Sequence, residues 1–446
     1  MRARFPTVSR SLPRADGMGC SLSSPETSIP KKPMKTHSLL PFVSRAAHWS
    51  ICGILAASAH IWPLSGKTHA AAYTFTSIAD ADGIFAKAGN NREGIGTAQL
   101  SINNAGTVAF RSFLDDGGTG VFTGSGGPIQ SIALSSDPIF RVVVGASINS
   151  AGTVAFLGIL DSGGQGIFTG NNSQITTIAL NTEPTFSTFG FPFVNDAGKV
   201  GFNVLLTDGS RSIVTRNGGL TTTIAAESGP IFSGVGGNIS INSSGTVAFF
   251  GRLENGQFGI FSGSGGPPKT ITLGSALDLS DGTSINDAGS VAFNFGGAVY
   301  VGNGNSLTII ADTGGPFGAF GRYSAINNLG KVVFLAGLDS GGGGIFTGPD
   351  PVADKVIRIG ESLFGSSLVS AEIEPLAQIF GNMDINDLGQ VAFHYELADG
   401  RQGIAVANPV PEPSSLSLLF IVIGLIAARR KSHPAGRRSA SLRLLT

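Results

Sequence analysis

One eight-residue pattern, Asn-x-x-Gly-x-x-Ala-Phe, occurs seven times in this 446-residue chain, with Gly201 and Val333 replacing the alanine in two copies. Successive copies start 46, 46, 47, 44, 41 and 59 residues apart. A period of this length is typical of stacked supersecondary units that cannot bury their apolar faces alone. The residues expected to form the repeated turns are Asn103, Gly106, Asn149, Gly152, Asn195, Gly198, Asn242, Gly245, Asn286, Gly289, Asn327, Gly330, Asn386 and Gly389.

Each repeat contains four short β-prone runs bounded by Gly, Asn, Asp and Pro. In the second repeat the first run ends at Ile148, and the second covers Val154–Phe156. The third covers Gly166–Gly170 and the fourth Thr177–Leu180. The Asn-x-x-Gly segment suits the turn between the first two runs, because Asn bonds backbone groups locally and Gly takes a positive φ without steric cost. We therefore expect four antiparallel strands per repeat.

Four antiparallel strands in ~40–50 residues match one propeller blade. A parallel β-helix is the rival architecture, but its coils are shorter and lack hairpin turns. The last repeat stops after the third run, Gly403–Val406, while Phe75–Ala79 resembles a fourth run. The sequence therefore predicts an all-β, seven-bladed β-propeller of four-stranded antiparallel blades, with an N-terminal strand closing the last blade. In this arrangement Phe75–Ala79 pairs with Gly403–Ala407, which removes open sheet edges.

The net charge of zero conceals three differently charged regions. Residues 1–70 carry nine Lys/Arg and two Asp/Glu, and residues 410–446 carry six and one. Residues 71–409 carry 14 Lys/Arg and 26 Asp/Glu, a net charge of −12. We divide the chain into a leader (1–70), a body of seven repeats (71–409) and a tail (410–446). An acidic body is unsuited to nucleic acid, whose phosphates require basic surfaces.

Residue types that often act in catalysis, metal binding or disulfide formation are scarce in the body. Both cysteines and both tryptophans lie in the leader, and His394 is the one histidine of the body. A thiolate metal site or a disulfide in the body is therefore excluded. His394 directly follows the repeat phenylalanine Phe393, and no Gly-x-Ser-x-Gly elbow accompanies it, so we interpret it as a packed histidine.

The leader is typical of a secretory signal peptide whose true start is Met34. Lys35 and Arg45 precede an apolar stretch, Ile51–Ala59, and small-residue sites follow at Ala59 and Ala70.

The tail contains Pro411-Glu412-Pro413, an apolar run over Leu416–Ala428 and the basic cluster Arg429-Arg430-Lys431. The run is short for a spanning helix, which needs ~20 residues, and the basic cluster would stay cytoplasmic. This three-part end resembles the PEP-CTERM sorting signal of Gram-negative bacteria that make exopolysaccharide. The resemblance implies transient membrane anchoring, cleavage by an exosortase near Pro411–Pro413, and delivery to the cell surface or extracellular matrix. A plain inner-membrane tail anchor is the alternative.

The body, over about residues 73–407, also resembles exported tandem-repeat proteins defined by the same Asn-x-x-Gly-x-x-Ala-Phe unit. This resemblance implies a tandem-repeat architecture and export from the cell, and it implies no particular activity.

A ligand face is expected where the loops between repeats and the turns between second and third strands meet. The longest loop, before the seventh repeat, carries Glu361, Glu372 and Glu374. These carboxylates form our candidate ligand loop, able to hold Ca²⁺ or flank a glycosidic bond; a solvated acidic loop is the simpler interpretation. Asp residues of the second-to-third turns lack the calcium-loop pattern and are interpreted as turn formers. They are Asp115, Asp116, Asp161, Asp208 and Asp339.

Three functional classes remain open. The first, which we favour, is a non-catalytic surface or matrix protein that binds polysaccharide or other proteins and needs no cofactor beyond Ca²⁺ in the acidic loop. The second is an exported propeller hydrolase or lyase acting on glycans. Without Trp in the body, stacking on sugars would fall to Tyr300, Tyr323 and Tyr395. The third class is a purely structural spacer.

Overall fold

The computed structural model describes residues 72–81, 83–87, 95, 99–172, 174–275, 279–369 and 383–411. All of them belong to one compact unit, Ser65–Thr446. The described residues form β-strands, turns and bends without any helix. The predicted leader and the predicted tail beyond residue 411 lie outside the described residues, so the division of the chain at residues 70 and 410 stays a prediction.

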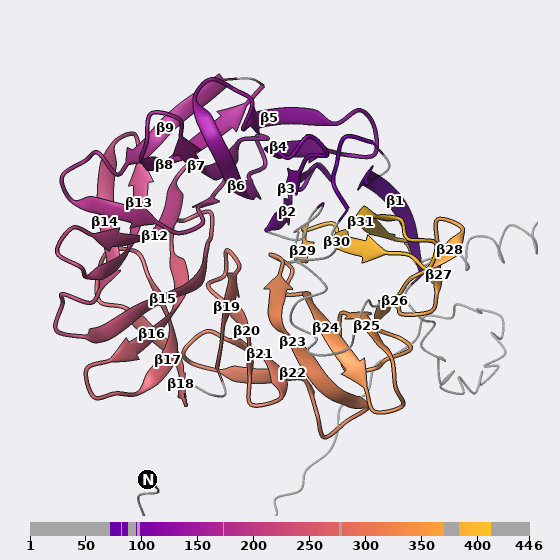
Figure 1. The fold of residues 1–446 in the computed structure, drawn as a ribbon. Helices are drawn as coiled ribbons and strands as arrows, with labels where there is room; N and C mark the ends of the chain where they lie inside the picture. Colours follow the sequence, from indigo (N-terminus) through magenta and orange to yellow (C-terminus); the bar gives the residue numbers. More distant parts are fainter. Residues whose placement is uncertain are drawn as a thin grey trace, which may run out of the picture. The chain divides into compact units, whose positions relative to one another are not determined.

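The strands follow the period of the sequence repeat (Figure 1). The first three repeats contain β2 (Leu100–Ile102), β3 (Val108–Phe113), β4 (Thr119–Gly124) and β5 (Gln130–Leu134); β6 (Phe140–Ile148), β7 (Val154–Leu160), β8 (Gln165–Asn171) and β9 (Gln174–Leu180); and β10 (Phe186–Phe189), β11 (Phe193–Val194), β12 (Val200–Leu206), β13 (Arg211–Asn217) and β14 (Leu220–Ala226). The fourth and fifth contain β15 (Phe232–Ile241), β16 (Val247–Leu253), β17 (Phe258–Gly263) and β18 (Lys269–Gly274); and β19 (Leu279–Ile285), β20 (Val291–Phe295), β21 (Ala298–Gly302) and β22 (Leu307–Asp312).

The sixth repeat contains β23 (Phe317–Ile326), β24 (Val332–Leu338), β25 (Gly343–Phe346) and β26 (Lys355–Arg358). A small hairpin follows, made of β27 (Ser362–Leu363) and β28 (Ser366–Ser367). The seventh repeat contains β29 (Asp384–Ile385), β30 (Val391–Glu396) and β31 (Gln402–Pro409), and β1 (Tyr73–Asp80) lies beside it.

Within each repeat the strands pair antiparallel in chain order, so the fold is built from four-stranded antiparallel sheets. In the third repeat the first strand is split into β10 and β11. The fourth and fifth sheets touch at one parallel bridge, Asn238 with Gly282, between their first strands. The expected partner of the N-terminal strand is present: Phe75 pairs with Ala407 and Thr76 with Val406 in an antiparallel ladder between β1 and β31.

The repeated turn follows from the chemistry of its Asn and Gly. Asn149 Oδ1 accepts hydrogen bonds from the backbone N–H groups of Ala151 (3.1 Å) and Thr153 (2.9 Å). Gly152 has a φ of 78°, a left-handed conformation that disfavours residues with a Cβ. The side-chain oxygen and the glycine together shape one tight connection between β6 and β7.

The amide nitrogen of the same asparagine has a second function. Asn149 Nδ2 donates to the carbonyl of Asn195, the corresponding residue of the next repeat, at 3.1 Å. The same bond recurs at every repeat, and the series returns to its start where Asn386 Nδ2 donates to the carbonyl of Asn103 at 2.9 Å. Figure 1 shows the corresponding arrangement, in which the sheets follow one another around a common centre.

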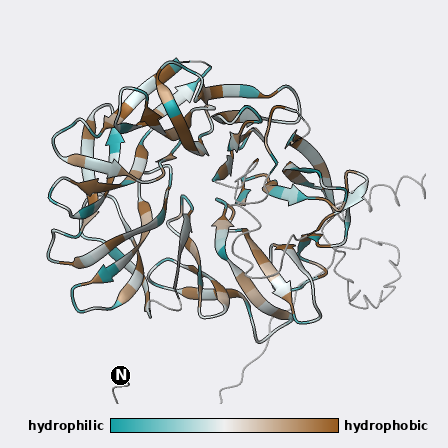
Figure 2. Ribbon diagram, viewed as in Figure 1, coloured by the Kyte–Doolittle hydropathy of each residue, from teal (hydrophilic) through white to brown (hydrophobic). Residues whose placement is uncertain are grey.

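The hydrophobic core is divided among neighbouring sheets rather than gathered in one place. One cluster combines Ala109 and Val121 of the first repeat with Phe140, Phe156 and Phe168 of the second. These three phenylalanine rings pack together, with centroids 5.0 to 5.8 Å apart. Hydrophobic residues occur in all the described sheets (Figure 2). Each sheet therefore buries its apolar faces only against the sheets beside it.

Candidate functional site

The first strands of the repeats line a cavity of about 250 Å³ at the centre of the sheets. Its wall includes the residue two positions before each repeat asparagine, because the first strand of each repeat faces the centre. The seven residues at this position are Ser101, Ser147, Phe193, Ser240, Ser284, Ala325 and Asp384. One carboxylate thus interrupts an otherwise neutral series.

Several of these side chains bridge neighbouring repeats. Ser147 Oγ accepts a hydrogen bond from the N–H of Val194, and Ser284 Oγ accepts one from Ile326, each at 3.1 Å. Asp384 makes the corresponding contact: its Oδ2 accepts from the N–H of Ile102 at 3.0 Å. The wall of the cavity therefore also joins the inner edges of adjacent sheets.

Asp384 is the charged group of this wall. Its Oδ2 also accepts from Ser101 Oγ (3.1 Å), and its Oδ1 accepts from the N–H of Ile385 (2.9 Å). Burial raises the pKa of Asp384 to about 6, and the three hydrogen-bond donors oppose that rise. At neutral pH the side chain is ionised, in a partly buried position on the cavity wall.

Three side-chain oxygens of the wall lack a hydrogen-bond partner among the described residues: Gln99 Oε1, Ser240 Oγ and Ser324 Oγ. Gln99 is 4% exposed and Ser324 is 6% exposed. Buried polar atoms are normally satisfied by protein, water or ligand. Each of the three oxygens is enclosed by protein, so none of them presents a hydrogen-bonding group to the cavity.

A second cavity, of about 160 Å³, lies at the end of the centre where the Asn-Gly turns gather. Both cavities share six aliphatic residues, each of which precedes a repeat asparagine: Ile102, Ile148, Val194, Ile241, Ile285 and Ile326. The seventh, Ile385, lines the second cavity. In the second cavity the residues after the asparagines also bridge repeats; the Ser150 N–H, for example, donates to Asp196 Oδ1 at 2.8 Å. The acidic side chains there therefore join the turns of neighbouring repeats.

The structure resolves the surroundings of one residue of the predicted ligand loop. Glu361 forms an ion pair with Lys355 and accepts a hydrogen bond from the N–H of Arg358 (3.1 Å), so it stabilises the turn after β26. Glu372 and Glu374 lie outside the described residues, and their joint site with Glu361 stays a prediction. Among the residues that the structure describes, no group of three or more His, Cys, Asp or Glu side chains could hold a metal ion.

The predicted turn aspartates lie in the turns between second and third strands. Asp116 Oδ1 accepts from the N–H of Gly118 (2.9 Å), and Asp208 Oδ1 accepts from the N–H of Ser210 (2.8 Å). The backbone N–H groups of Asp115, Asp161 and Asp339 bond the loops between repeats, at the carbonyls of Ile84, Ile139 and Pro316. These turns and loops therefore do share one face.

The remaining candidates lie in different environments. His394 is buried at 4% exposure on β30, and Tyr395 beside it is buried at 2%. The Tyr300 ring stacks on Phe293, with centroids 5.8 Å apart. Tyr323 is the tyrosine that lines the central cavity.

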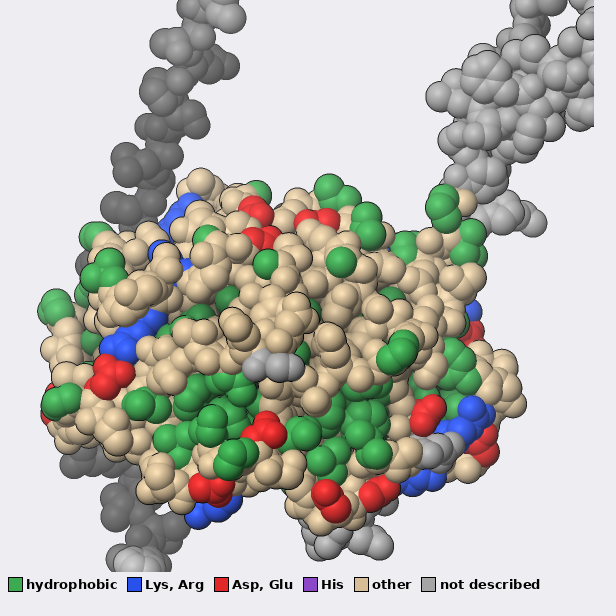
Figure 3. All heavy atoms as spheres, turned by 90° about the horizontal axis from the view of Figure 1, so that it is seen from above, with side chains coloured by type: hydrophobic (Ala, Val, Ile, Leu, Met, Phe, Trp, Pro, Cys, Tyr) green, Lys and Arg blue, Asp and Glu red, His purple; other side chains and the backbone are tan. Residues whose placement is uncertain are grey.

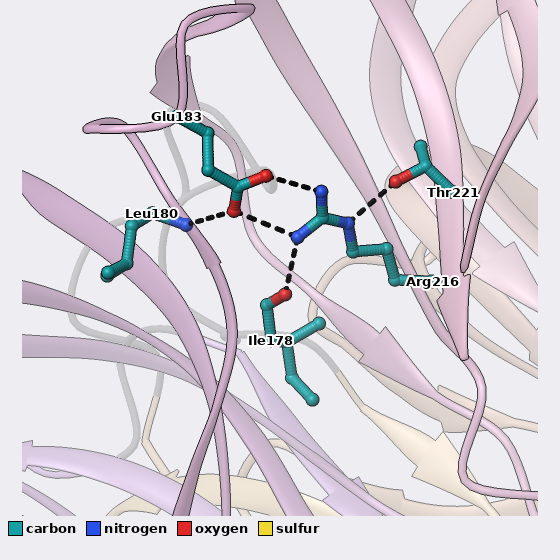
Figure 4. Close-up of polar contacts among 5 residues, drawn as sticks. All are labelled: Ile178, Leu180, Glu183, Arg216 and Thr221. Atoms are coloured by element: carbon teal, nitrogen blue, oxygen red, sulfur yellow. Dashed lines mark hydrogen bonds and ion pairs between the residues drawn. The ribbon is translucent and has the colours of Figure 1, made fainter. Parts of the chain in front are cut away.

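A polar contact between two repeats accounts for another acidic loop residue (Figure 4). Glu183, in the loop between β9 and β10, forms a two-pronged ion pair with Arg216 of β13, with contacts of 2.9 and 2.5 Å. The hydrogen bond from Arg216 lowers the pKa of Glu183. Arg216 also donates to the Ile178 carbonyl and to Thr221 Oγ1, both at 2.7 Å. The ion pair of Glu183 therefore helps to hold the second and third sheets together.

Sequence reasoning missed the Asp384 cavity, although a signal existed. When the repeats are aligned on their asparagines, Asp384 stands where the other copies carry Ser, Phe or Ala. Gln99 gave no such signal, because its position in the repeat varies freely.

Two family models match parts of the chain. Residues 409–431 match the PEP-CTERM protein-sorting motif, which confirms the predicted sorting signal. The motif implies export, processing by an exosortase and membrane-associated sorting in Gram-negative bacteria. Of its predicted residues, Pro411 is described, whereas Glu412, Pro413, Arg429, Arg430 and Lys431 lie outside the described residues. Within the described part of the chain, no helix is long and apolar enough to cross a membrane. Residues 381–417 match a family of unknown function (DUF7453).

No curated protein sequence matches the chain. Solved structures with a similar arrangement include Pyrococcus horikoshii acylaminoacyl peptidase (TM-score 0.45, 11% identity, 78% of this chain and 56% of that one). PorZ, a surface component of the type-IX secretion system of Porphyromonas gingivalis, has a TM-score of 0.43 and 10% identity over 72% of this chain and 48% of its own. The SapL1 lectin has a TM-score of 0.34 and 11% identity over 71% of this chain and 97% of its own. The chain spans about half the length of the first two, and likenesses this distant assign no function to it.

Proposed function

We propose that this chain is an exported protein of the cell surface or extracellular matrix, with a non-catalytic role in binding polysaccharide or protein ligands. The sorting motif at residues 409–431 carries this proposal, since it is an address for export. In this proposal the leader is removed, an exosortase processes the tail, and residues 71–409 remain as the functional body.

We also propose that the body is a seven-bladed β-propeller closed by its N-terminal strand. The series of hydrogen bonds between successive repeat asparagines supports this architecture, since it passes through all seven copies and returns to the first. The ladder between β1 and β31 supports it further, because it supplies the fourth strand of the seventh sheet from the other end of the body.

The ligand face that we favour is the one where loops between repeats meet the second-to-third turns. Ile84, Ile139 and Ile231 occupy equivalent loop positions and are 61%, 51% and 41% exposed. Their carbonyls accept hydrogen bonds from the N–H groups of Asp115, Asp161 and Glu254 respectively. Exposed isoleucines beside acidic turns, repeated on one face, provide apolar contact and polar groups for a partner. A further cavity of about 540 Å³ lies beside Ile84 and Asp115.

One face of the molecule offers little to a charged partner. In the face shown in Figure 3, charged side chains are few and most of the area is uncharged. This distribution favours a neutral or weakly charged ligand, such as a polysaccharide or a protein surface.

The export part is tested in a producing bacterium by changing Arg429, Arg430 and Lys431 to Ala. We expect the variant to keep its tail and to accumulate in the membrane fraction, whereas the natural protein loses the tail and reaches the surface. Arg443→Ala, a basic change beyond the matched motif, is the control. Equal processing of all three proteins would contradict the assigned sorting function.

The binding part is tested by measuring retention of the purified protein on cell-derived polysaccharide and on isolated cell envelopes. We expect Ile139→Lys to weaken retention at least fivefold, because it places a charge in the loop face. Leu220→Lys changes an equally large residue that is 73% exposed at the start of β14, and it should have no effect. Equal loss in both variants, or turnover of the polysaccharide, would overturn the proposed role; turnover would favour a glycan hydrolase or lyase.

A further inference from the structure

The turns that contain the repeat asparagines differ between repeats in one exposed side chain. The residue two positions after each asparagine is Leu329 in the sixth repeat and Leu388 in the seventh, whereas the other five repeats carry Ala or Ser there. Leu329 is 79% exposed and Leu388 is 64% exposed. The turn does not require a leucine, because the other copies form the same connection with a short side chain. Large apolar groups left in water on two successive turns indicate a surface that meets a partner.

The turns that carry the two leucines lie side by side. Asn327 Nδ2 of the sixth turn donates to the carbonyl of Asn386 in the seventh at 2.9 Å. The N–H of Asn328 donates to Asp387 Oδ1 at 2.8 Å. The two exposed leucines therefore belong to one part of the surface.

The described chain also ends at this part of the surface. Pro409 lies against the seventh turn, where a Cβ added to Gly389 would stand 3.6 Å from Pro409 Cγ. Val410, which follows, is 44% exposed and adds another apolar side chain. Its N–H donates to the carbonyl of Ala72 at 2.8 Å, so both ends of the described body meet here.

The sequence of the tail limits the distance between this surface and a membrane. The structure describes the chain as far as Pro411, and the apolar run Leu416–Ala428 begins five residues later. Five residues of fully extended chain span at most about 17 Å. The matched motif implies membrane-associated sorting, so the exposed leucines stay close to the bilayer while the tail is held there. Because the run is short for a spanning helix, which needs ~20 residues, a second lipid contact strengthens the anchor.

We propose that the sixth and seventh Asn turns form a membrane-contacting surface, on which Leu329, Leu388 and Val410 enter the interfacial layer of a lipid bilayer while the tail anchors the protein. This inference rests on the proposed export function. The contact is apolar rather than electrostatic, since the carboxylate of Asp387 beside Leu388 offers nothing to anionic headgroups. The loop face, at the opposite ends of the first strands, then points away from the bilayer.

The experiment measures lipid contact with a fluorophore attached to one cysteine of the full chain. The body contains no cysteine, so Cys20→Ser and Cys52→Ser remove the two that the leader carries. Leu329→Cys or Leu388→Cys then provides the labelling position. The labelled protein is reconstituted into vesicles of phosphatidylethanolamine and phosphatidylglycerol, with or without a lipid that carries a nitroxide near its headgroup. We expect the nitroxide lipid to lower the fluorescence of either label about threefold.

Two further labelling positions complete the test. Ile139→Cys is the control, because Ile139 is 51% exposed and precedes β6, whose other end adjoins the Asn149 turn. Its label should keep the same fluorescence in both kinds of vesicle. Leu419→Cys lies in the apolar run and reports whether the tail itself enters the bilayer, so its label should be strongly quenched.

The outcomes separate this inference from the export function. A quenched label at Leu419 with unquenched labels at Leu329 and Leu388 would overturn the membrane-contacting surface alone. Unquenched labels at all three positions would overturn both that surface and the anchoring role of the tail. Quenching at the two leucines that only equals quenching at Ile139 would also overturn the surface, because the contact would then be unspecific. Quenching at the leucines without quenching at Leu419 would support the surface and refute anchoring by the tail.

Discussion

Replacing Asn149 with aspartate would test how the sheets hold together. The new carboxylate can still accept from the N–H groups of Ala151 and Thr153, as the amide oxygen does now. The lost group is the Nδ2 donor, which bonds the carbonyl of Asn195 in the next repeat at 3.1 Å. Asn149 is 5% exposed, so water cannot easily replace that donor. The substitution therefore separates cohesion between repeats from turn formation.

An acceptor left without its buried partner costs about 1–3 kcal/mol, and a negative oxygen facing a carbonyl oxygen adds to that cost. We expect Asn149→Asp to lower the free energy of unfolding by about 3 kcal/mol. The measurement is urea unfolding followed by circular dichroism at neutral pH. Asn171→Asp is the matched control, because Asn171 Nδ2 donates to the Ala151 carbonyl at 3.2 Å on the surface. We expect a change within about 0.5 kcal/mol for the control.

The reasoning fails if Asn149→Asp and Asn171→Asp change stability equally. It also fails if Asn149→Ser, which keeps a smaller side chain without the amide donor, matches the natural protein.

Three further predictions concern other contacts. Because burial raises the pKa of Asp384 to about 6 from its ordinary value of 3.8, the folded state holds this proton more tightly than the unfolded chain. The contribution of Asp384 to stability should therefore be greatest below about pH 4, fall by up to about 3 kcal/mol as the pH rises to 6, and stay constant above pH 6. Urea unfolding measured as a function of pH should show this fall in the natural protein and lose it in Asp384→Asn. The same pH profile in both proteins would contradict the prediction. Arg216→Met should cost about 1–2 kcal/mol, since it leaves Glu183 and the Ile178 carbonyl without their donor; thermal unfolding that matches the natural protein would show that the pair contributes nothing. Deleting β1 (Tyr73–Asp80) should expose the edge of β31, and the shortened protein should associate, as measured by size-exclusion chromatography. A shortened protein that stays monomeric and keeps the same unfolding midpoint would show that the ladder between β1 and β31 is unimportant.

Much of the architecture was predictable because it repeats. The residues of each Asn-x-x-Gly copy favour a tight turn by themselves, and Gly152 has the positive φ that such a turn requires. The pairing of Phe75 with Ala407 was also predictable, since a repeat that lacks its fourth strand requires one from elsewhere. The inter-repeat donation by Asn149 Nδ2 was missed. Its signal was the use of Asn at all seven positions and never Asp, although an Asp oxygen could serve the turn.

The candidate sites were less predictable. Glu361 was expected to face a ligand, but its partner Lys355 lies six residues earlier and holds it in the turn after β26. Asp384 was not predicted as a site residue, because one aspartate in a short strand does not form a recognisable motif. Its environment arises only when β2 and β29, 283 residues apart at Ser101 and Asp384, lie side by side.

The sequence alone determined the repeat unit, its turns, the strand order within each sheet and the export address, because these depend on residues close together in the chain. The tertiary structure alone decided which polar groups meet at the centre and which lose their partners there. Burial and hydrogen bonding at Asp384, Gln99 and Ser324 come from strands that different repeats contribute. A local pattern cannot specify such a set, because desolvation depends on everything packed around a group rather than on its neighbours in sequence.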